Sequence, residues 1–376
     1  MQKKKKNGTI FNHLDVELLN YQVFSHDFDP QRRKEYFGAS LQDYPGRSLC
    51  LTDANDIIQL SPNIRHGWDW ITRHYDRIGL SHTKSVIWDD QLDLINQFTN
   101  SNLSTFIFGD AIHKIRPDDR RLKATKAMSS KNEFVWLCNE LGVSTPHTSC
   151  FQSKSELFSC ENFTFPVYLK ADISVSGLGV IHCKTRKDLE DELIRLDVGA
   201  AFQIQEEIDA VAFVNLQYRV DDNGVVKKIV ATEQILNGYS HCGNIFPSRF
   251  APWNITDKLA QCLANNGVKD VFAFDVIATK GGEYFALECN PRYNGSTYPA
   301  IAATKLGVEG WKSKTYTTRF QFLNQLRLDK LEYNPIKKAG VVIINWGCIN
   351  QNKLGILIAG SHSEQVEIED RLTDIL

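Results

Sequence analysis

The sequence predicts a mixed fold, with an α/β region in the first third of the chain and an α+β region after it. Two observations support this prediction. From residue 47 to residue 108, short apolar segments alternate with segments of helical spacing, as in a parallel sheet covered by helices. From residue 213 to residue 290, pairs of alternating segments flank turn sequences, as in antiparallel hairpins. The length of 376 residues allows roughly two or three domains.

The first region is expected to contain three strands and two helices in alternation. Within Trp68–Ile78, apolar side chains recur at steps of three and four residues, which indicates a helix. No Gly-x-Gly-x-x-Gly turn is present, so this half-Rossmann unit is not expected to bind a dinucleotide. Residues 1–46 are polar and irregular. The expected strands are 48–52, 85–88 and 105–108, and the expected helices are 68–78 and 91–98.

The second region begins with a helix at Lys131–Leu141, which Gly142 is expected to end. Asn223-Gly224 is a strong signal for one hairpin, and residues 279–282 are expected to turn a second. Residues 238–247, which are rich in Gly, His and Asn, are expected to form a loop between the hairpins. The other expected strands are 165–170, 180–183, 201–208, 213–220, 225–232, 271–278, 284–290, 341–345 and 354–359, with helices at 187–196 and 298–305.

The second hairpin brings acidic side chains together. If Ala278 pairs with Glu283 across the turn, Asp275 lies opposite Ala286 and diagonal to Glu288. Asp275, Glu288 and Asn290 then point to the same face of the sheet. A shift of one residue would put the two carboxylates on opposite faces, so the prediction depends on the register.

Two carboxylates and an amide oxygen suit a hard cation such as Mg²⁺ or Mn²⁺. Mg²⁺ keeps several waters and bridges substrate phosphates, so few protein ligands are needed. The alternative is a solvated hairpin face that carries acidic residues by chance.

Lys170 ends an apolar strand and is followed by a loop that contains Ser176, Gly177 and Gly179. Backbone amides of such a loop, together with a lysine, can contact phosphates, and glycine allows a close approach. A plain β-turn is the alternative reading. Lys131 precedes Lys170 by 39 residues and is, by itself, an ordinary surface lysine.

These motifs, in this order, resemble the ATP-grasp superfamily. The matching segments are Lys131-Asn132, Leu141–Pro146, Phe165–Ala171, Ser176–Val180, Gln205–Ile208, Phe274–Val276 and Leu287–Arg292. They span residues 126–310, and the half-Rossmann unit resembles the domain that precedes ATP-grasp modules. The whole chain looks most like carboxylate–amine ligases of peptide and natural-product biosynthesis.

The resemblance implies a pre-ATP-grasp domain at 1–125, a small lobe with the phosphate loop at 126–208, and a large lobe with the metal site at 209–376. It also implies roles for individual residues. Arg292 and Lys170 would be catalytic. Asp275, Glu288 and Asn290 would hold the metal. The residues that contact ATP would be Lys131, Lys170, Ser176, Gly177, Gly179, Glu206, Glu207 and Ile208. A contact to the ribose is not obvious, with Asp209 and Asn215 as candidates.

The implied reaction is the activation of a carboxylate by ATP as an acyl phosphate, followed by attack of an amine, with ATP and Mg²⁺ or Mn²⁺ required. The expected partners are small carboxylates and amines, such as amino acids or peptides. A thiol or hydroxyl acceptor, and a non-catalytic ATP-binding regulator of the same fold, remain alternatives. The sequence leaves the oligomeric state open, with a homodimer as one option. It also leaves open whether His241 faces the acceptor, and whether Arg219 and Arg249 bind a substrate carboxylate or form salt bridges.

Composition is that of an average globular chain, with 42% apolar and 23% charged residues. The net charge of −2 gives no global basic field, so nucleic acid is not an expected partner. No segment has the roughly 20 apolar residues of a membrane helix, and the lysines at positions 3–6 precede no signal-peptide core. Nine scattered cysteines without a Cys-x-x-Cys pair indicate reduced thiols, so a cytoplasmic location is expected.

Overall fold

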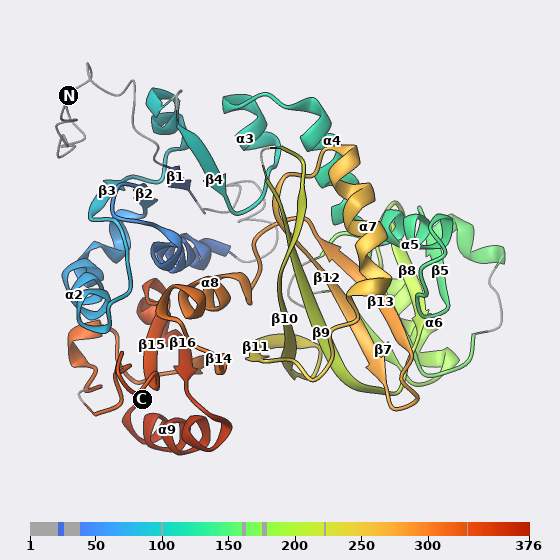
Figure 1. Ribbon diagram of the computed structural model, residues 1–376. Coiled ribbons are helices and arrows are strands. Elements are labelled where there is room, and N and C mark those ends of the chain that lie inside the picture. The colour runs from blue at the N-terminus through green and yellow to red at the C-terminus, as the bar shows by residue number, and fades with distance from the viewer. Residues whose placement is uncertain are drawn as a thin grey trace. The chain divides into compact units, whose positions relative to one another are not determined.

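The computed structural model describes residues 22–25, 38–98, 101–159, 163–174, 179–221, 223–328 and 330–376. The chain divides into two compact units, which Figure 1 colours along the sequence. One unit, called unit 2 here, comprises residues 118–296, and unit 1 combines the residues before 118 with residues 297–376. The division at residues 125 and 208 that the sequence suggested stays a prediction. Within the described residues, no helix is both long and apolar enough to cross a membrane.

Unit 1 contains the expected parallel sheet. All three strand pairings are parallel, in the order β3-β2-β1-β4. The helix α2 spans Trp68–Ile78, as predicted, and ends at Gly79 in the left-handed conformation. The strands are β1 (Gln22–Ser25), β2 (Ile57–Leu60), β3 (Ser85–Trp88) and β4 (Asn102–Thr105), and α3 spans Asp110–Ile115.

Three predicted elements of unit 1 are wrong in type or place. The expected strand at residues 48–52 lies in and just after a 3₁₀ segment, Gly38–Leu51, and β2 takes its place in the sheet. The hydroxyls of Ser48 and Thr52 donate to carbonyls three residues back, which favours a turn over an extended strand. The expected helix at 91–98 is a 3₁₀ segment at Leu92–Phe98, and the strand expected at 105–108 ends at Thr105.

The rest of unit 1 is an antiparallel group formed by the end of the chain. The two predicted strands at 341–345 and 354–359 and the predicted helix at 298–305 are confirmed. The elements are α8 (Thr297–Leu306), β14 (Trp311–Thr317), β15 (Gly340–Asn345), β16 (Lys353–Ala359) and α9 (His362–Ile375). β16 pairs with β14 on one side and β15 on the other.

His74 links α2 to this group as a fully buried, neutral imidazole. Its Nδ1 lies 2.6 Å from Glu332 Oε1, and the Ile343 N–H donates to its Nε2 at 3.1 Å. Burial lowers the pKa of His74. Burial raises the pKa of Glu332, but hydrogen bonds from His74 and Arg77 outweigh it and lower that pKa to about 2.

We expect the protein to lose stability on acidification through this pair. Both folded-state pKa values lie below their unfolded values, so the stabilisation is complete at neutral pH and is lost as pH falls below about 6.5 for His74. The free energy of unfolding in urea should fall from pH 7.5 to pH 5, and His74→Gln should reduce that fall. The control is His362→Gln, on an exposed residue. An equal pH dependence in His74→Gln and the wild type would contradict this account.

Unit 2 begins with two helices and a small sheet. The helix predicted from Lys131 is confirmed, and Gly142 adopts a positive φ of 60° just after it. The small sheet has the order β5-β8-β6-β7. Its elements are α4 (Asp119–Ser129), α5 (Lys131–Glu140), β5 (Thr148–Phe151), β6 (Val167–Ala171), β7 (Val180–Cys183), α6 (Arg186–Arg195) and β8 (Phe202–Glu206).

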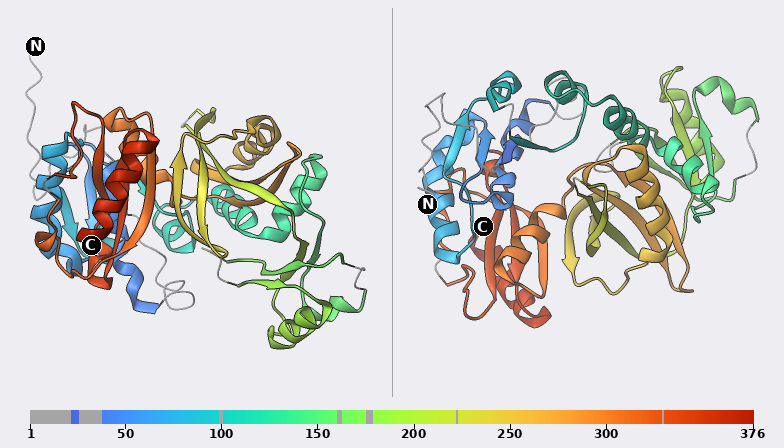
Figure 2. Two further views of the ribbon diagram at one scale, coloured as in Figure 1. Left: turned by 90° about the horizontal axis from the view of Figure 1, so that it is seen from below. Right: turned by 45° about the horizontal axis from the view of Figure 1, so that its top comes forward.

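The larger sheet of unit 2 contains both predicted hairpins, which are confirmed. Its strands follow one another in space as β13-β12-β9-β10-β11. They are β9 (Ala210–Val220), β10 (Val226–Asn237), β11 (Ser240–Phe246), β12 (Asp270–Thr279) and β13 (Tyr284–Asn290), and the helix α7 (Trp253–Asn266) lies against one face, as Figures 1 and 2 show.

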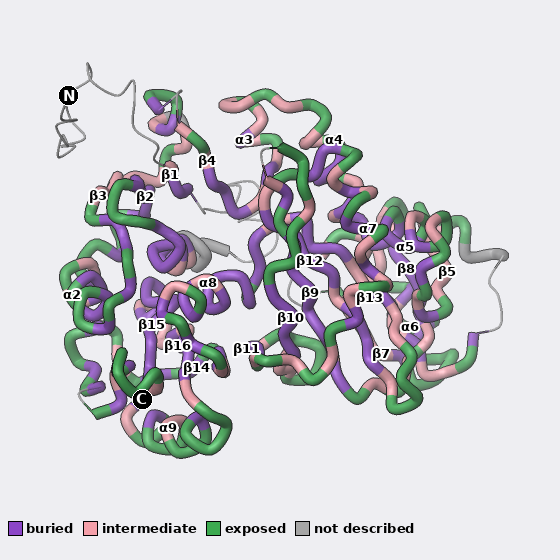
Figure 3. The backbone as a smooth tube through the Cα atoms, viewed as in Figure 1, coloured by how far each residue is buried: buried purple, intermediate pink, exposed green. Residues whose placement is uncertain are grey.

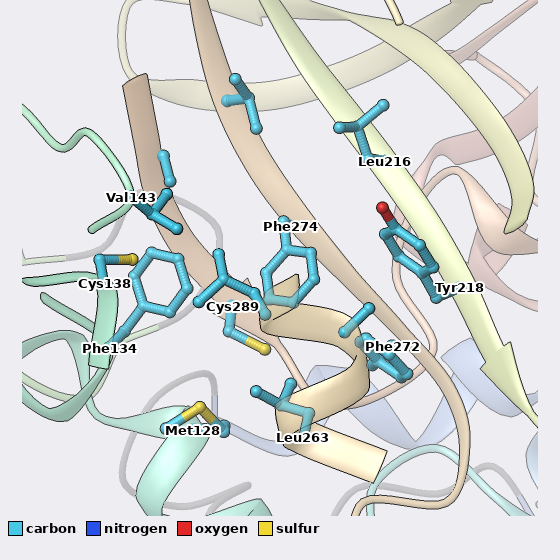
Figure 4. Close-up of a cluster of buried hydrophobic side chains, with 14 of the residues drawn as sticks. Met128, Phe134, Cys138, Val143, Leu216, Tyr218, Leu263, Phe272, Phe274 and Cys289 are labelled. Carbon is cyan, nitrogen blue, oxygen red and sulfur yellow. The ribbon is translucent and has the colours of Figure 1, made fainter. Parts of the chain in front are cut away.

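The two faces of this sheet differ in chemistry. On one face, Leu216, Phe274 and their neighbours form the buried core with Leu263 of α7 and Phe134 of α5 (Figure 4). The Phe134 and Phe274 rings stack at 6.0 Å. Figure 3 shows that β9 and β12 are buried over most of their length. Side chains alternate along a strand, so the opposite face carries Asn215, Asp275 and other polar residues.

The expected loop at residues 238–247 is wrong, because this segment is largely the strand β11. β10 continues to Asn237, and a turn at Gly238-Tyr239 leads directly into β11. Gly238 has a φ of 59°, which glycine adopts readily. Asn237 pairs with Ser240, so the turn has glycine at its first position and two residues in all, which is itself a hairpin signal.

Candidate active site

The β12–β13 hairpin brings Asp275 and Glu288 directly opposite each other. The predicted register is wrong by one residue at the turn, where Ala278 pairs with Tyr284 and not with Glu283. A β-bulge then adds one residue to β13 between the partners of Val276 and Asp275. Without this bulge Asp275 would face Leu287, and Glu288 would point to the other side. The bulge therefore puts both carboxylates on one face, as predicted, but as a direct pair and not as the diagonal neighbours that the sequence suggested.

Amide side chains from three strands fix the position of the Asp275 carboxylate. Asn215 Nδ2 and Gln234 Nε2 each donate to Oδ1 at 2.6 Å, and Asn290 Nδ2 donates to Oδ2 at 3.0 Å. Asn215 is therefore a partner of Asp275, and its contact with the ribose stays a prediction. Strand pairing explains the convergence, because Asn215 lies opposite Asp275 in the β9–β12 register.

The pKa values of the two carboxylates are shifted in opposite directions. Burial and the charge of Glu288 raise the pKa of Asp275. Burial also raises the pKa of Glu288, but Lys131, Lys170 and Arg292 outweigh it and lower that pKa. Lys131 Nζ lies 3.4 Å from Glu288 Oε2. The pair is thus held together by surrounding positive charge, and a cation between the carboxylates would relieve their repulsion.

The donor set fits Mg²⁺ or Mn²⁺ better than a metal with a full protein cage. Across the part of the chain that the structure describes, no group of three or more His, Cys, Asp or Glu side chains is arranged to hold a metal. Asp275, Glu288 and Asn290 supply two carboxylates and one amide, all hard oxygen ligands. Such a partial shell suits Mg²⁺, which completes its octahedron with water and phosphate oxygens.

Two lysines approach the carboxylates: Lys131 from the start of α5, and Lys170 from β6 of the small sheet. Lys131 is 6% exposed, and its Nζ donates to Ser174 Oγ at 2.9 Å. Lys170 Nζ donates to Gln205 Oε1 at 2.6 Å. Burial is the main cause that lowers the pKa of Lys170 to about 8, and the charge of Lys131 contributes. Two lysines this close favour the arrival of a polyanion.

The predicted phosphate loop is only partly described. Ser176 and Gly177 lie outside the described residues. Gly179 has a φ of 69°, which favours glycine, and a Cβ there would also lie 3.1 Å from the Ala171 Cβ, a tight contact. The Gly179 carbonyl accepts a hydrogen bond from Ala171 N at 2.9 Å, which closes the base of the loop.

The predicted hinge residues separate into two groups. Glu206 and Ile208 line the pocket described below. Glu206 Oε1 accepts a hydrogen bond from Thr164 N at 2.9 Å. Glu207 is exposed and accepts a hydrogen bond from the Tyr168 hydroxyl at 2.6 Å, while His182 Nε2 lies 3.4 Å away. Glu207 itself does not line the pocket, although its partner Tyr168 does. The nucleotide roles of all three residues stay predictions.

One pocket of unit 2, of about 320 Å³, joins these residues. This volume is within the range of small-molecule sites. One part of its wall is apolar, with Ile208, Phe213 and Ile277. Phe213 pairs with Ile277, and two residues along the same strands Asn215 pairs with Asp275, so the apolar wall adjoins the carboxylates.

Beyond the carboxylates the pocket wall is polar. Arg292 lines it there, together with residues that the sequence analysis left out or left open: Asn215, Gln234, His241, Asn244, Asn294 and Ser296. Asn215 faces the pocket from β9, whose other face is apolar core. His241 and Asn244 lie on β11, and Asn294 and Ser296 lie in the segment between β13 and α8. Arg219 and Arg249 do not line this pocket. They pair with Asp270 at 3.3 Å and Glu233 at 2.8 Å, which supports the salt-bridge alternative.

We expect Lys170→Ala to weaken the binding of ATP more than that of adenosine, because a lysine in this pocket would contact the phosphates of the nucleotide and not its base. Losing a charge-assisted contact of about 1.5–3 kcal/mol corresponds to about a 10- to 100-fold weaker ATP affinity. Calorimetric titration with ATP and adenosine measures both affinities. Lys187→Ala, on the exposed surface of α6, is the control. Equal weakening of both ligands would count against a phosphate contact.

The structure is similar to several solved structures of ATP-dependent enzymes that share one fold. No protein-family model matches the sequence. The N5-carboxyaminoimidazole ribonucleotide synthetase of Thermus thermophilus is similar in structure, with a TM-score of 0.60 at 14% identity over 95% of this chain and 98% of that one. The biotin carboxylase of Campylobacter jejuni, in its β,γ-ATP complex, gives 0.60 at 11% identity, over 96% of this chain and 92% of that one.

A third similar structure is the L-amino acid ligase of Bacillus licheniformis. Its TM-score is 0.56 at 10% identity, over 96% of this chain and 98% of that chain. All three similarities extend over nearly the whole chain. They show that this protein shares the fold of these enzymes, while the low identities leave its activity to be argued from the site itself.

Proposed function

Because this chain has the ATP-grasp fold, we propose that it is an ATP-dependent ligase that activates a carboxylate as an acyl phosphate and joins it to an amine. The observation that carries the proposal is the pairing of Asp275 with Glu288 opposite Lys131 and Lys170 in one pocket. A structural role alone would not require two carboxylates and two lysines in a half-buried cluster, because each buried charge costs desolvation energy.

The nucleotide would bind across the pocket from its apolar wall to its lysines. Ile208, Phe213 and Ile277 offer the adenine ring an apolar slot beside the end of β8. The phosphates would then reach Lys131 and Lys170, with Gly179 and the preceding loop residues, Ser176 and Gly177, over them. Glu206 and Glu207 are proposed for the edge of the adenine, through backbone or side chain.

The metal would be held by Asp275, Glu288 and Asn290. When bound, Mg²⁺ or Mn²⁺ would supply positive charge to the phosphate oxygens of the nucleotide. The amide donors from Asn215 and Gln234 keep Asp275 aimed at Glu288, so the ligands need little rearrangement on binding.

The first chemical step is transfer of the γ-phosphoryl group to the substrate carboxylate. A carboxylate oxygen attacks the γ-phosphorus, the bond to the β-phosphate oxygen breaks, and ADP leaves. The protein contributes position and positive charge, from Lys131, Lys170 and Arg292. Arg292 faces the pocket just after β13, where its planar group can meet the oxygens of the transferred phosphoryl group.

The second step forms the product. An amine attacks the carbonyl carbon of the acyl phosphate, a C–N bond forms, and phosphate leaves. The acyl phosphate must be kept from water, which a small pocket favours. The similar structures include a biotin carboxylase and an L-amino acid ligase, so they support ATP-dependent ligation without selecting the substrates of this chain.

Several broader assignments accompany this proposal. We propose small carboxylates and amines, such as amino acids or peptides, as substrates, and the cytoplasm as the place of the reaction. The free state of every cysteine among the described residues is compatible with a reducing compartment. The pre-ATP-grasp role of residues 1–125 and a homodimer are proposals of the same kind.

A trapping screen tests the function. The protein, ATP and Mg²⁺ are incubated with pools of amino acids, small carboxylates or bicarbonate, with and without hydroxylamine. Carboxylate-dependent ADP release with a hydroxamate product is expected. ADP release without hydroxamate would favour another chemistry. ATP binding without turnover in any pool would favour the non-catalytic regulator, and product formation only with thiols or alcohols would favour the other acceptor classes.

A further inference from the structure

A second β-bulge shapes the polar end of the pocket. In the β10–β11 pairing, Leu236 faces His241 and Ile235 faces Gly243, so Cys242 is the extra residue. His241 and Asn244 are three positions apart and would point to opposite faces of a regular strand. The bulge turns both toward the pocket, and both line it. Bulges are frequent beside active sites because they re-aim single side chains in this way.

Hydrogen bonds fix the orientation of the His241 ring. Its Nε2 lies 2.7 Å from Asn244 Oδ1, and Asn244 Nδ2 donates to the buried Thr232 Oγ1 at 2.9 Å. Since the amide nitrogen is used by Thr232, the amide oxygen faces the ring and accepts from the Nε2–H. In the neutral ring, Nδ1 is then the nitrogen with a free lone pair.

Gly295 gives the ring its place in the pocket. A Cβ at this position would lie 2.5 Å from His241 Cε1 and 3.1 Å from Nδ1, so any larger residue would force the ring to shift. Gly295 follows Arg292 by three residues, so the glycine holds the imidazole next to the segment that carries the proposed catalytic arginine. Such a close approach would be lost with any larger residue.

The surroundings also favour the neutral imidazole. His241 is exposed at the edge of the pocket; partial desolvation by the pocket wall lowers the pKa of its ring, and the positive charge of Arg292 lowers it further, against the opposite effect of Asn244. A neutral histidine whose lone pair is free can accept a proton, whereas the lysines and Arg292 in the same pocket cannot do so while charged.

We propose that His241 is the general base that takes the proton from the acceptor amine as it attacks the acyl phosphate, with Asn244 and Thr232 as its positioning residues. This inference rests on the proposed ligase function. In the step, the amine nitrogen forms a bond to the acyl carbon and the bond from that carbon to the phosphate oxygen breaks. The N–H proton passes to His241 Nδ1, and phosphate leaves. The imidazolium then returns its proton to solvent.

The test separates the two half-reactions with two kinds of nucleophile. With the carboxylate found by the trapping screen, hydroxylamine reports acyl phosphate formation, because it reacts without needing a base. Ammonia, methylamine and the common amino acids report amide formation. His241→Gln should keep hydroxamate formation within about threefold, whereas amide formation should fall about 10²- to 10⁴-fold. Imidazole added to His241→Ala should restore part of the amide rate.

Two further variants separate catalysis from folding. Gly295→Ala should displace the ring and reduce amide formation with hydroxamate formation retained. His362→Gln, at the start of α9 and exposed, should leave both rates unchanged. Equal loss of both rates in His241→Gln, or no loss of amide formation, would overturn the role of His241 while the ligase function stands. No hydroxamate from the wild type would overturn the function itself. Hydroxamate without amide from any amine would also overturn this role, since no amine would be deprotonated.

Discussion

Glu288→Gln is expected to abolish ATP turnover. The substitution keeps the size of the side chain and removes one of the two carboxylate charges that face the proposed cation. It also leaves Lys131, 3.4 Å away, without its anionic partner. Loss of groups that merely support metal ligands already costs 10- to 100-fold in affinity or activity, so loss of a ligand charge should cost at least about 10²-fold. ADP release at ordinary and at raised Mg²⁺ measures the effect.

The same hairpin provides the control for this variant. Glu283 lies at the exposed turn between β12 and β13, so Glu283→Gln changes the net charge equally without touching the pocket. Urea unfolding of both variants checks that the fold is intact. Near-normal ADP release from a well-folded Glu288→Gln protein at ordinary Mg²⁺ would remove Glu288 from the proposed metal site.

Arg292→Lys is expected to reduce turnover far more than nucleotide affinity. The variant keeps a positive charge but loses the planar group that can meet two oxygens at once. If Arg292 acts on charge that develops during phosphoryl transfer, its loss should cost about 10²- to 10³-fold in kcat. The Kd for ATP should change only a few-fold, since interactions made only in the transition state do not contribute to ground-state binding.

Thermal melting and single-turnover formation of the acyl phosphate should be measured together for this variant. A loss of thermal stability with unchanged chemistry would make Arg292 a structural residue. Arg219→Lys is the matched control, because Arg219 pairs with Asp270 and does not line the pocket. Unchanged single-turnover chemistry in a well-folded Arg292→Lys protein would contradict its catalytic role.

The sequence predicted the hairpin of Asp275 and Glu288 correctly, but not the way in which their side chains meet. Alternating apolar residues and the turn at 279–282 are local signals, and they were sufficient for the two strands. The bulge in β13 depends on how β13 fits against β12, and one extra residue leaves no mark in the composition of a strand. The expected diagonal contact is in fact a direct pair.

The hydrogen bonds that hold Asp275 in place could not be predicted from the sequence either. Asn215 and Gln234 come from β9 and β10, and they meet Asp275 only because of the register of three strands. Side chains so distant along the chain carry no shared local pattern. By contrast, Lys131 and Lys170 were found through the order of motifs, since each looks ordinary by itself. The β11 strand was missed although Gly238-Tyr239, with glycine first, is a recognisable two-residue hairpin turn.

The central claim, that the protein activates a carboxylate by phosphorylating it, is tested most directly by isotope transfer. The carboxylate identified in the screen is labelled with ¹⁸O in both oxygens and is turned over with unlabelled ATP and an acceptor. Our account predicts that one ¹⁸O atom appears in each phosphate released, because the attacking carboxylate oxygen stays with phosphorus when the acyl bond breaks. Phosphate without ¹⁸O, formed at the same rate as the product, would contradict it.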